Sequence, residues 1–228
     1  GLGYNPRTAT PPCVNDHDAV SGGSSSGAAA SVAFGLAPLA IGSDTGGSVR
    51  IPAAWNDLVG LKTTSGRLSL EGVVPLCARF DTVGPLCRSV EDAALALEAL
   101  EGSKPADLTN STLEGRRLAI CDTVALDALR PEPRAAFDTA IDRLRAMGAV
   151  VERIDIPQVE EALSLSGVLF AAEAYGTWKD TIEANPDLMY EEILMRFRGG
   201  ADVSAPDYVA AWQKLDGLRA DYYAATRE

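Results

Sequence analysis

Two stretches rich in serine and glycine are the places where this chain could do chemistry. GGSSSG covers residues 22–27 and DTGGS covers residues 44–48, so Ser48 lies 24 positions after Ser24. A serine hydroxyl becomes a nucleophile when a base takes its proton. A Gly-Gly-Ser turn at the end of a strand can also expose successive peptide N–H groups, which together can hold an oxyanion. Either this turn is simply tight, or its serine and its N–H groups are accessible to a substrate.

A stretch such as GGSSSG also has the composition of a flexible linker. Here it runs directly into the small and apolar residues of AAASVAFGL and then into APLAIGSD at residues 37–44. We expect both of these segments to be buried in the fold. The serine hydroxyls are then held by packed structure, as a catalytic role requires.

The usual partner of a catalytic serine is histidine, and this chain has only His17, between two aspartates. We interpret His17 as a solvated polar residue of a loop, not as a general base. The chain contains no S-x-x-K, G-x-x-x-x-G-K-[ST] or G-x-G-x-x-G motif. The lone histidine disfavours a histidine-dependent hydrolase, and the absent motifs disfavour a phosphate-loop nucleotidase.

The elements that must position the serines follow from capping residues and periodicity. Serines followed by small residues predict a short helix at 26–35, ended by Gly35, and a strand within 37–44 that carries the DTGGS turn at its end. Further along, Ser89 is expected to cap an amphipathic helix.

The second half of the chain reads as strand, helix and strand at 115–122, 131–149 and 150–157, followed by a mostly helical segment. This order predicts a βαβ unit with parallel strands and an α/β layered fold. We expect the later helices to break at Asn185–Pro186, at Gly199–Gly200 and at Pro206.

Composition narrows the class of protein. The 228 residues are 46% hydrophobic and carry a formal net charge of −12, with scattered basic residues and no apolar run long enough to span a membrane. We therefore expect neither direct nucleic-acid binding nor a membrane partner. The four cysteines are far apart, which argues against a zinc site or a disulfide framework and favours reduced thiols in a cytoplasmic protein.

GGSSSGAAA, GSDTGGSVRIPA and GLKTTSGR, in this order, resemble the signature region of the amidase signature family. The likeness covers about residues 1–95 and its motifs are specific. It implies an α/β/α sandwich around a mixed sheet and amide hydrolysis without a cofactor. Because the chain starts without methionine and stops inside a helical pattern, we expect residues 1–228 to be one domain truncated at both ends. Residues 1–95 would form the signature core, and 96–228 the βαβ and helical part.

The resemblance also implies roles for individual residues. Ser48 looks like the nucleophile, and Ser24 like the family's bridging serine, which follows a cis peptide bond and relays a proton to a lysine. The backbone N–H groups of Thr45, Gly46, Gly47 and Ser48 would form the oxyanion hole. The family's lysine lies upstream of the bridging serine, and none of the 23 residues before Ser24 is lysine.

Five other positions are considered as support for this site or as its neighbours. Asp44 and Arg50 flank Ser48, and we expect an ion pair that fixes the turn and, through it, the shape needed for catalysis. Ser25 is expected to support the site through hydrogen bonds. Lys62, within GLKTT, is interpreted as a structural or surface residue and not as the base. Cys77 either lines a pocket or, as we favour, is a buried thiol.

Together these features favour a stand-alone amidase that acts on a small-molecule amide, and they are compatible with a homo-oligomer. One alternative is the glutamine-hydrolysing A subunit of an aminoacyl-tRNA amidotransferase, whose sequences usually read PTYGR where this chain has TTSGR at 63–67. Another is a catalytically inactive binding scaffold, which the missing lysine favours and the retained serines and glycines oppose.

Overall fold

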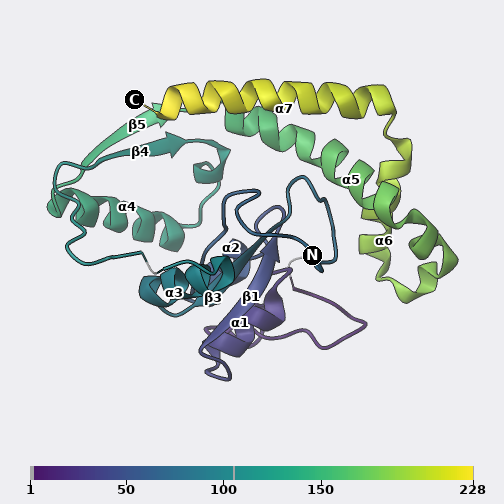
Figure 1. The fold of residues 1–228 in the computed structure, drawn as a ribbon, viewed down its shortest axis with the longest axis horizontal. Helices are drawn as coiled ribbons and strands as arrows, with labels where there is room; N and C mark the ends of the chain where they lie inside the picture. Colours follow the sequence, from purple (N-terminus) through teal and green to yellow (C-terminus); the bar gives the residue numbers. More distant parts are fainter. Residues whose placement is uncertain (1–2, 105, 228) are drawn as a thin grey trace. The chain divides into compact units, whose positions relative to one another are not determined.

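The computed structural model describes residues 3–104 and 106–227 (Figure 1). It divides into two compact units. The first runs to Leu108 and also includes Phe170–Asp202, and the second consists of Thr109–Leu169 and the chain from Val203 onward. Both serine motifs lie in the first unit.

The first unit is built on a three-stranded antiparallel sheet with the strand order β1-β3-β2. Its strands are β1 (Leu39–Asp44), β2 (Val59–Gly60) and β3 (Thr82–Cys87). Leu39 and Ile41 are exposed, at 40% and 44%. The expectation that residues 37–44 are buried is therefore wrong for the face of β1 that carries Leu39 and Ile41, because the burial of this strand alternates from one residue to the next.

Three helices pack against this sheet: α1 (Ser26–Ala33) contacts β1, α2 (Arg50–Trp55) contacts β2 and α3 (Val90–Glu101) contacts β3 (Figure 1). The side chains that fill the space between them are small, which allows close approach of helix and strand. One core cluster consists of Ala29, Val49, Ala53 and Leu86.

The helix ends agree with their sequence signals. Gly35 has a φ of 74°, in the left-handed region where glycine ends helices, so the predicted stop after α1 is confirmed. Ser89 accepts a hydrogen bond from the Asp92 N–H at 3.0 Å and caps α3, as predicted.

In the second unit, β4 (Arg117–Asp122), α4 (Pro131–Ala146) and β5 (Val150–Asp155) form the predicted βαβ unit. The two strands are parallel, with Arg117 opposite Val150. Strands of the described chain thus form two separate sheets, one antiparallel and one parallel, in a mixed α/β fold.

The helical second half ends and restarts where the sequence predicts. Helix α5 (Gln158–Ala184) stops before the short helix η2 (Pro186–Leu188), and α6 (Glu191–Arg198) stops before η3 (Gly199–Asp202). Helix α7 (Ala205–Thr226) starts with Pro206 in its first turn, where a missing N–H costs no helical hydrogen bond. Proline and glycine residues therefore separate these helices, as expected.

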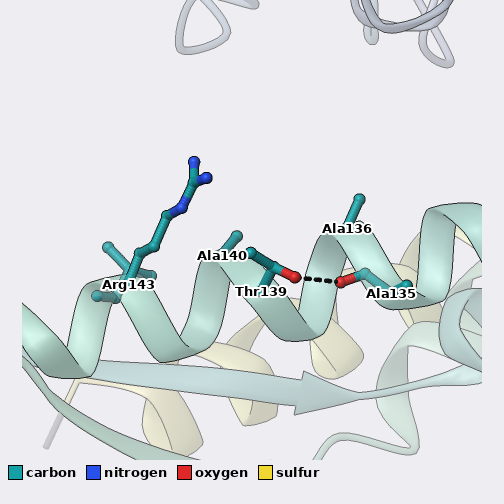
Figure 2. Close-up of a pocket in the computed structure, with 6 residues that line it drawn as sticks. Ala135, Ala136, Thr139, Ala140 and Arg143 are labelled. Atoms are coloured by element: carbon teal, nitrogen blue, oxygen red, sulfur yellow. Dashed lines mark hydrogen bonds between the residues drawn. The ribbon is translucent and has the colours of Figure 1, made fainter.

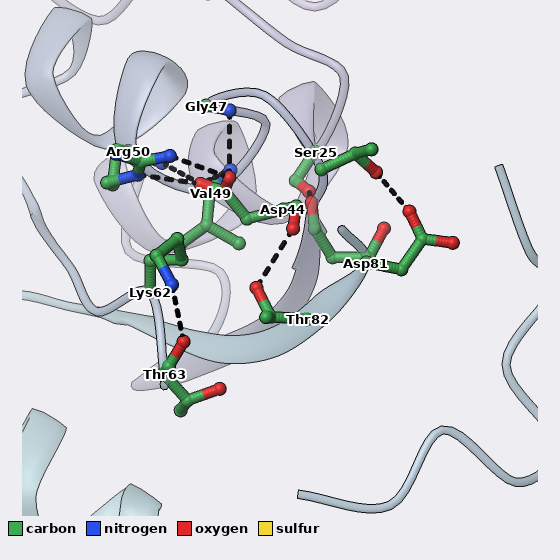
Figure 3. Close-up of polar contacts among 11 residues, drawn as sticks. Ser25, Asp44, Gly47, Val49, Arg50, Lys62, Thr63, Asp81 and Thr82 are labelled. Carbon is green, nitrogen blue, oxygen red and sulfur yellow. Dashed lines mark hydrogen bonds and ion pairs between the residues drawn. The ribbon is translucent and has the colours of Figure 1, made fainter. Parts of the chain in front are cut away.

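The turn between β1 and α2 is organised by the carboxylate of Asp44, which is 1% exposed. One oxygen, Oδ1, accepts from the Gly47 N–H at 2.8 Å and from Arg50 Nη2 at 2.9 Å. The other, Oδ2, accepts from the Val49 N–H at 3.1 Å and from the Arg50 N–H and Nε at 3.3 and 3.0 Å (Figure 3). The predicted ion pair is confirmed, and its carboxylate holds the serine turn in shape.

Burial by itself would raise the pKa of Asp44, but the contacts from Arg50, Gly47 and Val49 stabilise the charged form and leave the pKa below its ordinary value. A carboxyl group with a lowered pKa in the folded state contributes stability above the unfolded-state pKa of about 4. That contribution is lost as the pH falls through the folded-state pKa. The turn should therefore weaken in acid.

We expect Asp44→Asn to lower the free energy of unfolding at pH 7 by about 3 kcal/mol, because it leaves Arg50 and three backbone donors without their anion. Urea denaturation measures this change. The free energy of unfolding of the parent should decrease below about pH 4, and that of the variant should decrease less. Asp18→Asn, at an exposed loop position, is the matched control. Equal unfolding midpoints for the parent and Asp44→Asn would contradict this account.

Candidate active site

The two serine motifs meet in the structure through backbone and side-chain contacts of Ser25. The Ser25 N–H donates to the carbonyl oxygen of Ser48 at 3.1 Å, and the Ser25 hydroxyl donates to the carbonyl oxygen of Ser43 at 3.3 Å. Ser48 lies two residues before α2 begins, and Ser24 lies two residues before α1 begins. The hydrogen bonds of Ser25 thus join the start of α1 to the serine turn, which fits its predicted supporting role.

The peptide bond between Gly23 and Ser24 is cis, as the family resemblance implies. Ser24 is exposed, and Ser48 is partly buried. Both hydroxyl-bearing residues are therefore accessible from outside the core of the first unit.

The backbone N–H groups of the turn are not equivalent. Gly47 has a φ of 119°, a conformation that L side chains rarely adopt, and its N–H donates to Asp44. The N–H groups of Thr45, Gly46 and Ser48 donate to no acceptor within residues 3–104 and 106–227. This arrangement differs from the expectation that all four N–H groups face a substrate oxygen, because the Gly47 N–H already has an acceptor inside the turn.

A second aspartate, Asp81, ties the turn to the loop that precedes β3. Its carboxylate accepts a hydrogen bond from the Thr45 hydroxyl and also accepts from the N–H groups of Leu76 and Cys77 at 2.8 and 3.1 Å. The adjacent Thr82 hydroxyl donates to the Asp44 carbonyl oxygen at 2.9 Å (Figure 3). Our sequence reasoning missed Asp81 and Thr82. The only available signal was an Asp-Thr pair just before an apolar strand.

The two other candidate bases have different environments. The His17 ring packs against Phe34, with centroids 5.5 Å apart, at the end of α1. Lys62 donates from Nζ to the Thr63 carbonyl oxygen at 2.6 Å (Figure 3). In the described part of the chain neither side chain forms a hydrogen bond with Ser24 or Ser48. His17 is exposed, as its interpretation as a solvated loop residue requires, and the contact of Lys62 fits a structural role.

Cys77 is a buried thiol, as we favoured. Its Sγ donates to Glu173 Oε2 at 3.1 Å, and the residue is 1% exposed. Burial, followed by the hydrogen bond and charge of Glu173, raises the pKa of Cys77 far above its ordinary value. The thiol stays protonated and is unsuited to act as a nucleophile.

Two hollows differ in their chemistry. A hollow of about 570 Å³ in the second unit lies over α4, and Figure 2 shows that it is lined by alanines, Thr139 and Arg143. The Thr139 hydroxyl donates to the Ala135 carbonyl oxygen at 2.8 Å and is thus engaged within the helix. A hollow of about 460 Å³ in the first unit is bordered by Ser24, Tyr4 and Tyr190. Only the second hollow borders a serine motif.

Among the helices within residues 3–104 and 106–227, none combines the length and the apolar character that a membrane crossing needs. In the same residues no group of three or more His, Cys, Asp or Glu side chains is arranged to hold a metal ion.

Comparison with known proteins relates this chain to a family. A family model described as Amidase matches residues 3–222. The A subunit of the glutamyl-tRNA(Gln) amidotransferase of Staphylococcus saprophyticus is 39% identical over 184 residues, which cover 75% of this chain and 37% of that protein. Its counterpart from Symbiobacterium thermophilum is 42% identical over 172 residues, covering 70% of this chain and 35% of that protein.

Solved structures give the same relationship. A crystal structure of an amidase superposes with a TM-score of 0.91 at 32% identity and covers 99% of this chain and 51% of that one. Allophanate hydrolase of Kluyveromyces lactis superposes with a TM-score of 0.87 at 29% identity, covering 99% of this chain and 39% of that one. The chain thus spans little more than a third of the curated relatives named above and about half of the amidase structure. Because the family model matches nearly its whole length, the chain belongs to the amidase family.

Proposed function

We propose that the protein hydrolyses a carboxamide to a carboxylic acid and ammonia or an amine, through an acyl-enzyme on Ser48. The observation that carries this proposal is the hydrogen bond from the Ser25 N–H to the Ser48 carbonyl oxygen. It joins the residue after Ser24 to Ser48 itself, so the bridging serine and the nucleophile belong to one local structure.

In the first step the Ser48 hydroxyl oxygen attacks the amide carbon, and its proton passes to the Ser24 hydroxyl. Ser24 passes its own proton to a neutral lysine, the base that the family resemblance implies. The carbonyl oxygen becomes an oxyanion, which accepts hydrogen bonds from the N–H groups of Gly46 and Ser48, with Thr45 as a third candidate donor.

Collapse of this intermediate breaks the carbon–nitrogen bond, and the relay returns the proton to the departing nitrogen. The product that remains is an ester of Ser48. Water then attacks the ester by the same route, and the carboxylic acid leaves with the serine hydroxyl restored. The steps need neither a metal ion nor a redox cofactor.

A second candidate function is glutamine hydrolysis as the A subunit of an aminoacyl-tRNA amidotransferase. The names of the curated relatives favour it, since both relatives described above are such subunits. The acyl-enzyme chemistry on Ser48 would be the same, with glutamine as the amide.

An inactive scaffold is the remaining alternative, and it predicts neither hydrolysis nor reaction of Ser48 with electrophiles.

We expect Ser48→Ala to lower kcat/KM of the whole protein for amides by about 10³-fold or more, because no acyl-enzyme can form. Ser24→Ala should also be strongly impaired, because the relay is interrupted. The measurement is release of ammonia or amine from simple amides and glutamine between pH 6 and 10. Ser31→Ala is the matched control, since its hydroxyl donates to Ala28 within α1. Parent activity in Ser48→Ala would show that the nucleophile is another group.

A fluorophosphonate should label Ser48 in the whole protein, because an activated serine attacks phosphorus as it attacks a carbonyl carbon. Trypsin releases both serines on one peptide, residues 8–50, so fragmentation spectra must assign the added mass to Ser48. The Ser48→Ala protein provides the blank. A label on Ser24 instead, or no label in a protein that hydrolyses amides, would overturn the mechanism.

Lys62→Gln and His17→Gln should each keep kcat/KM for amides within about tenfold of the parent, because neither side chain supplies general-base catalysis, whose loss commonly costs about 10²–10⁴-fold. Circular dichroism of each variant checks that the fold is retained. A folded Lys62→Gln protein with activity as low as that of Ser48→Ala would assign the base to Lys62 and contradict the proposed relay.

A further inference from the structure

The nearest side chain to Gly46 from a distant part of the sequence is that of Phe170. A Cβ placed on Gly46 would lie 3.1 Å from Phe170 Cε2 and 3.6 Å from its Cζ, and no other non-neighbouring atom among the described residues would lie within 4 Å. Gly46 itself is exposed. The edge of an aromatic ring therefore borders Gly46, a residue whose N–H group we assign to the oxyanion.

Phe170 is held in place by a second ring. Phe80 meets it edge to face, with centroids 4.9 Å apart and an interplanar angle of 69°. Such pairs are a favoured aromatic geometry. Both rings are partly buried, so each keeps some surface that a ligand can cover.

Hydrogen bonds fix the segments that carry these rings. Phe80 directly precedes Asp81, whose carboxylate binds the Thr45 hydroxyl in the serine turn. On the α5 side, Glu173 accepts from the Cys77 thiol at 3.1 Å, and Trp178 Nε1 donates to the Pro75 carbonyl oxygen at 2.7 Å. The loop before β3 is thus tied both to the turn and to α5, and the aromatic pair has a defined place beside Gly46.

We propose that Phe170, supported by Phe80, is a specificity-determining residue that contacts the acyl group of the substrate and favours apolar, above all aromatic, carboxamides. This inference rests on the proposed function. A substrate oxygen bound at the Gly46 N–H brings the acyl carbon and its substituent within reach of the Phe170 ring. The leaving nitrogen must receive a proton through Ser24, whose neighbour Ser25 is hydrogen bonded to Ser48. The side bordered by Phe170 is therefore left for the acyl group.

An apolar ring against the acyl group has a direct chemical consequence. Covering ring surface with an aromatic or aliphatic acyl chain is favourable, whereas a charged acyl chain loses hydration there without a compensating hydrogen bond from the ring. Benzamide and hexanamide should thus be better substrates than acetamide, and glutamine should be a poor one. This preference distinguishes a stand-alone amidase from a glutamine-hydrolysing subunit.

The test compares kcat/KM of the whole protein for benzamide, hexanamide, acetamide and glutamine in the parent, Phe170→Ala and Phe170→Tyr. We expect Phe170→Ala to lower the ratio of kcat/KM for benzamide to kcat/KM for acetamide by about tenfold or more. This is the scale on which apolar pockets discriminate between substrates. Phe170→Tyr should keep the ratio within about threefold, since the ring remains. Phe34→Ala, at an exposed ring beyond the far end of α1, is the control.

Fluorophosphonate labelling of Ser48 separates this inference from the proposed function. If Ser48 is labelled and amides are hydrolysed, but the benzamide to acetamide ratio is unchanged in Phe170→Ala, the inference is overturned and the proposed function stands. A parent that prefers glutamine would overturn it as well. Should Phe170→Ala fail to fold, Phe170→Leu provides the same readout, with an expected loss of preference for benzamide over hexanamide.

Discussion

The buried carboxylate of Asp44 is the constraint on which the candidate site depends. An ionised carboxylate removed from water is costly unless it is paired and hydrogen bonded. Asp44 meets this requirement with five contacts drawn from Gly47, Val49 and Arg50, and these contacts dictate the path of the chain from β1 into α2. The position of Ser48, in the middle of that path, is a consequence of satisfying one charge.

The same requirement explains why the turn uses glycine next to the serine. The Gly47 N–H points to the carboxylate at a φ of 119°, whereas the N–H groups of Gly46 and Ser48 have no acceptor among the described residues. Gly46, without a side chain, leaves room for the edge of Phe170. Gly47 therefore allows the internal hydrogen bonds of the turn, and Gly46 keeps the outer surface of the turn free of a side chain.

Local features of the sequence predicted much of this arrangement. The Ser89 cap, the breaks at glycine and proline, the parallel βαβ unit and the Asp44–Arg50 pair all depend on neighbouring residues or on strong periodicity. The exposure of β1, the contact of Asp81 with Thr45 and the approach of Phe170 to Gly46 depend on pairing across 36 or more positions, which one sequence does not reveal. The hydrogen bond from the Gly47 N–H to Asp44 was not predicted for a related reason. A motif gives residue types and not the direction of each N–H group.

The central claim is that the acyl group of an amide substrate becomes covalently attached to Ser48. Rapid acid quenching of the whole protein during turnover of a slowly deacylated amide, followed by mass spectrometry, tests it directly. The account predicts an increase in mass equal to the acyl group, located on Ser48 and absent in Ser48→Ala. Steady amide hydrolysis with no acyl group on Ser48, under conditions in which deacylation limits the rate, would contradict it.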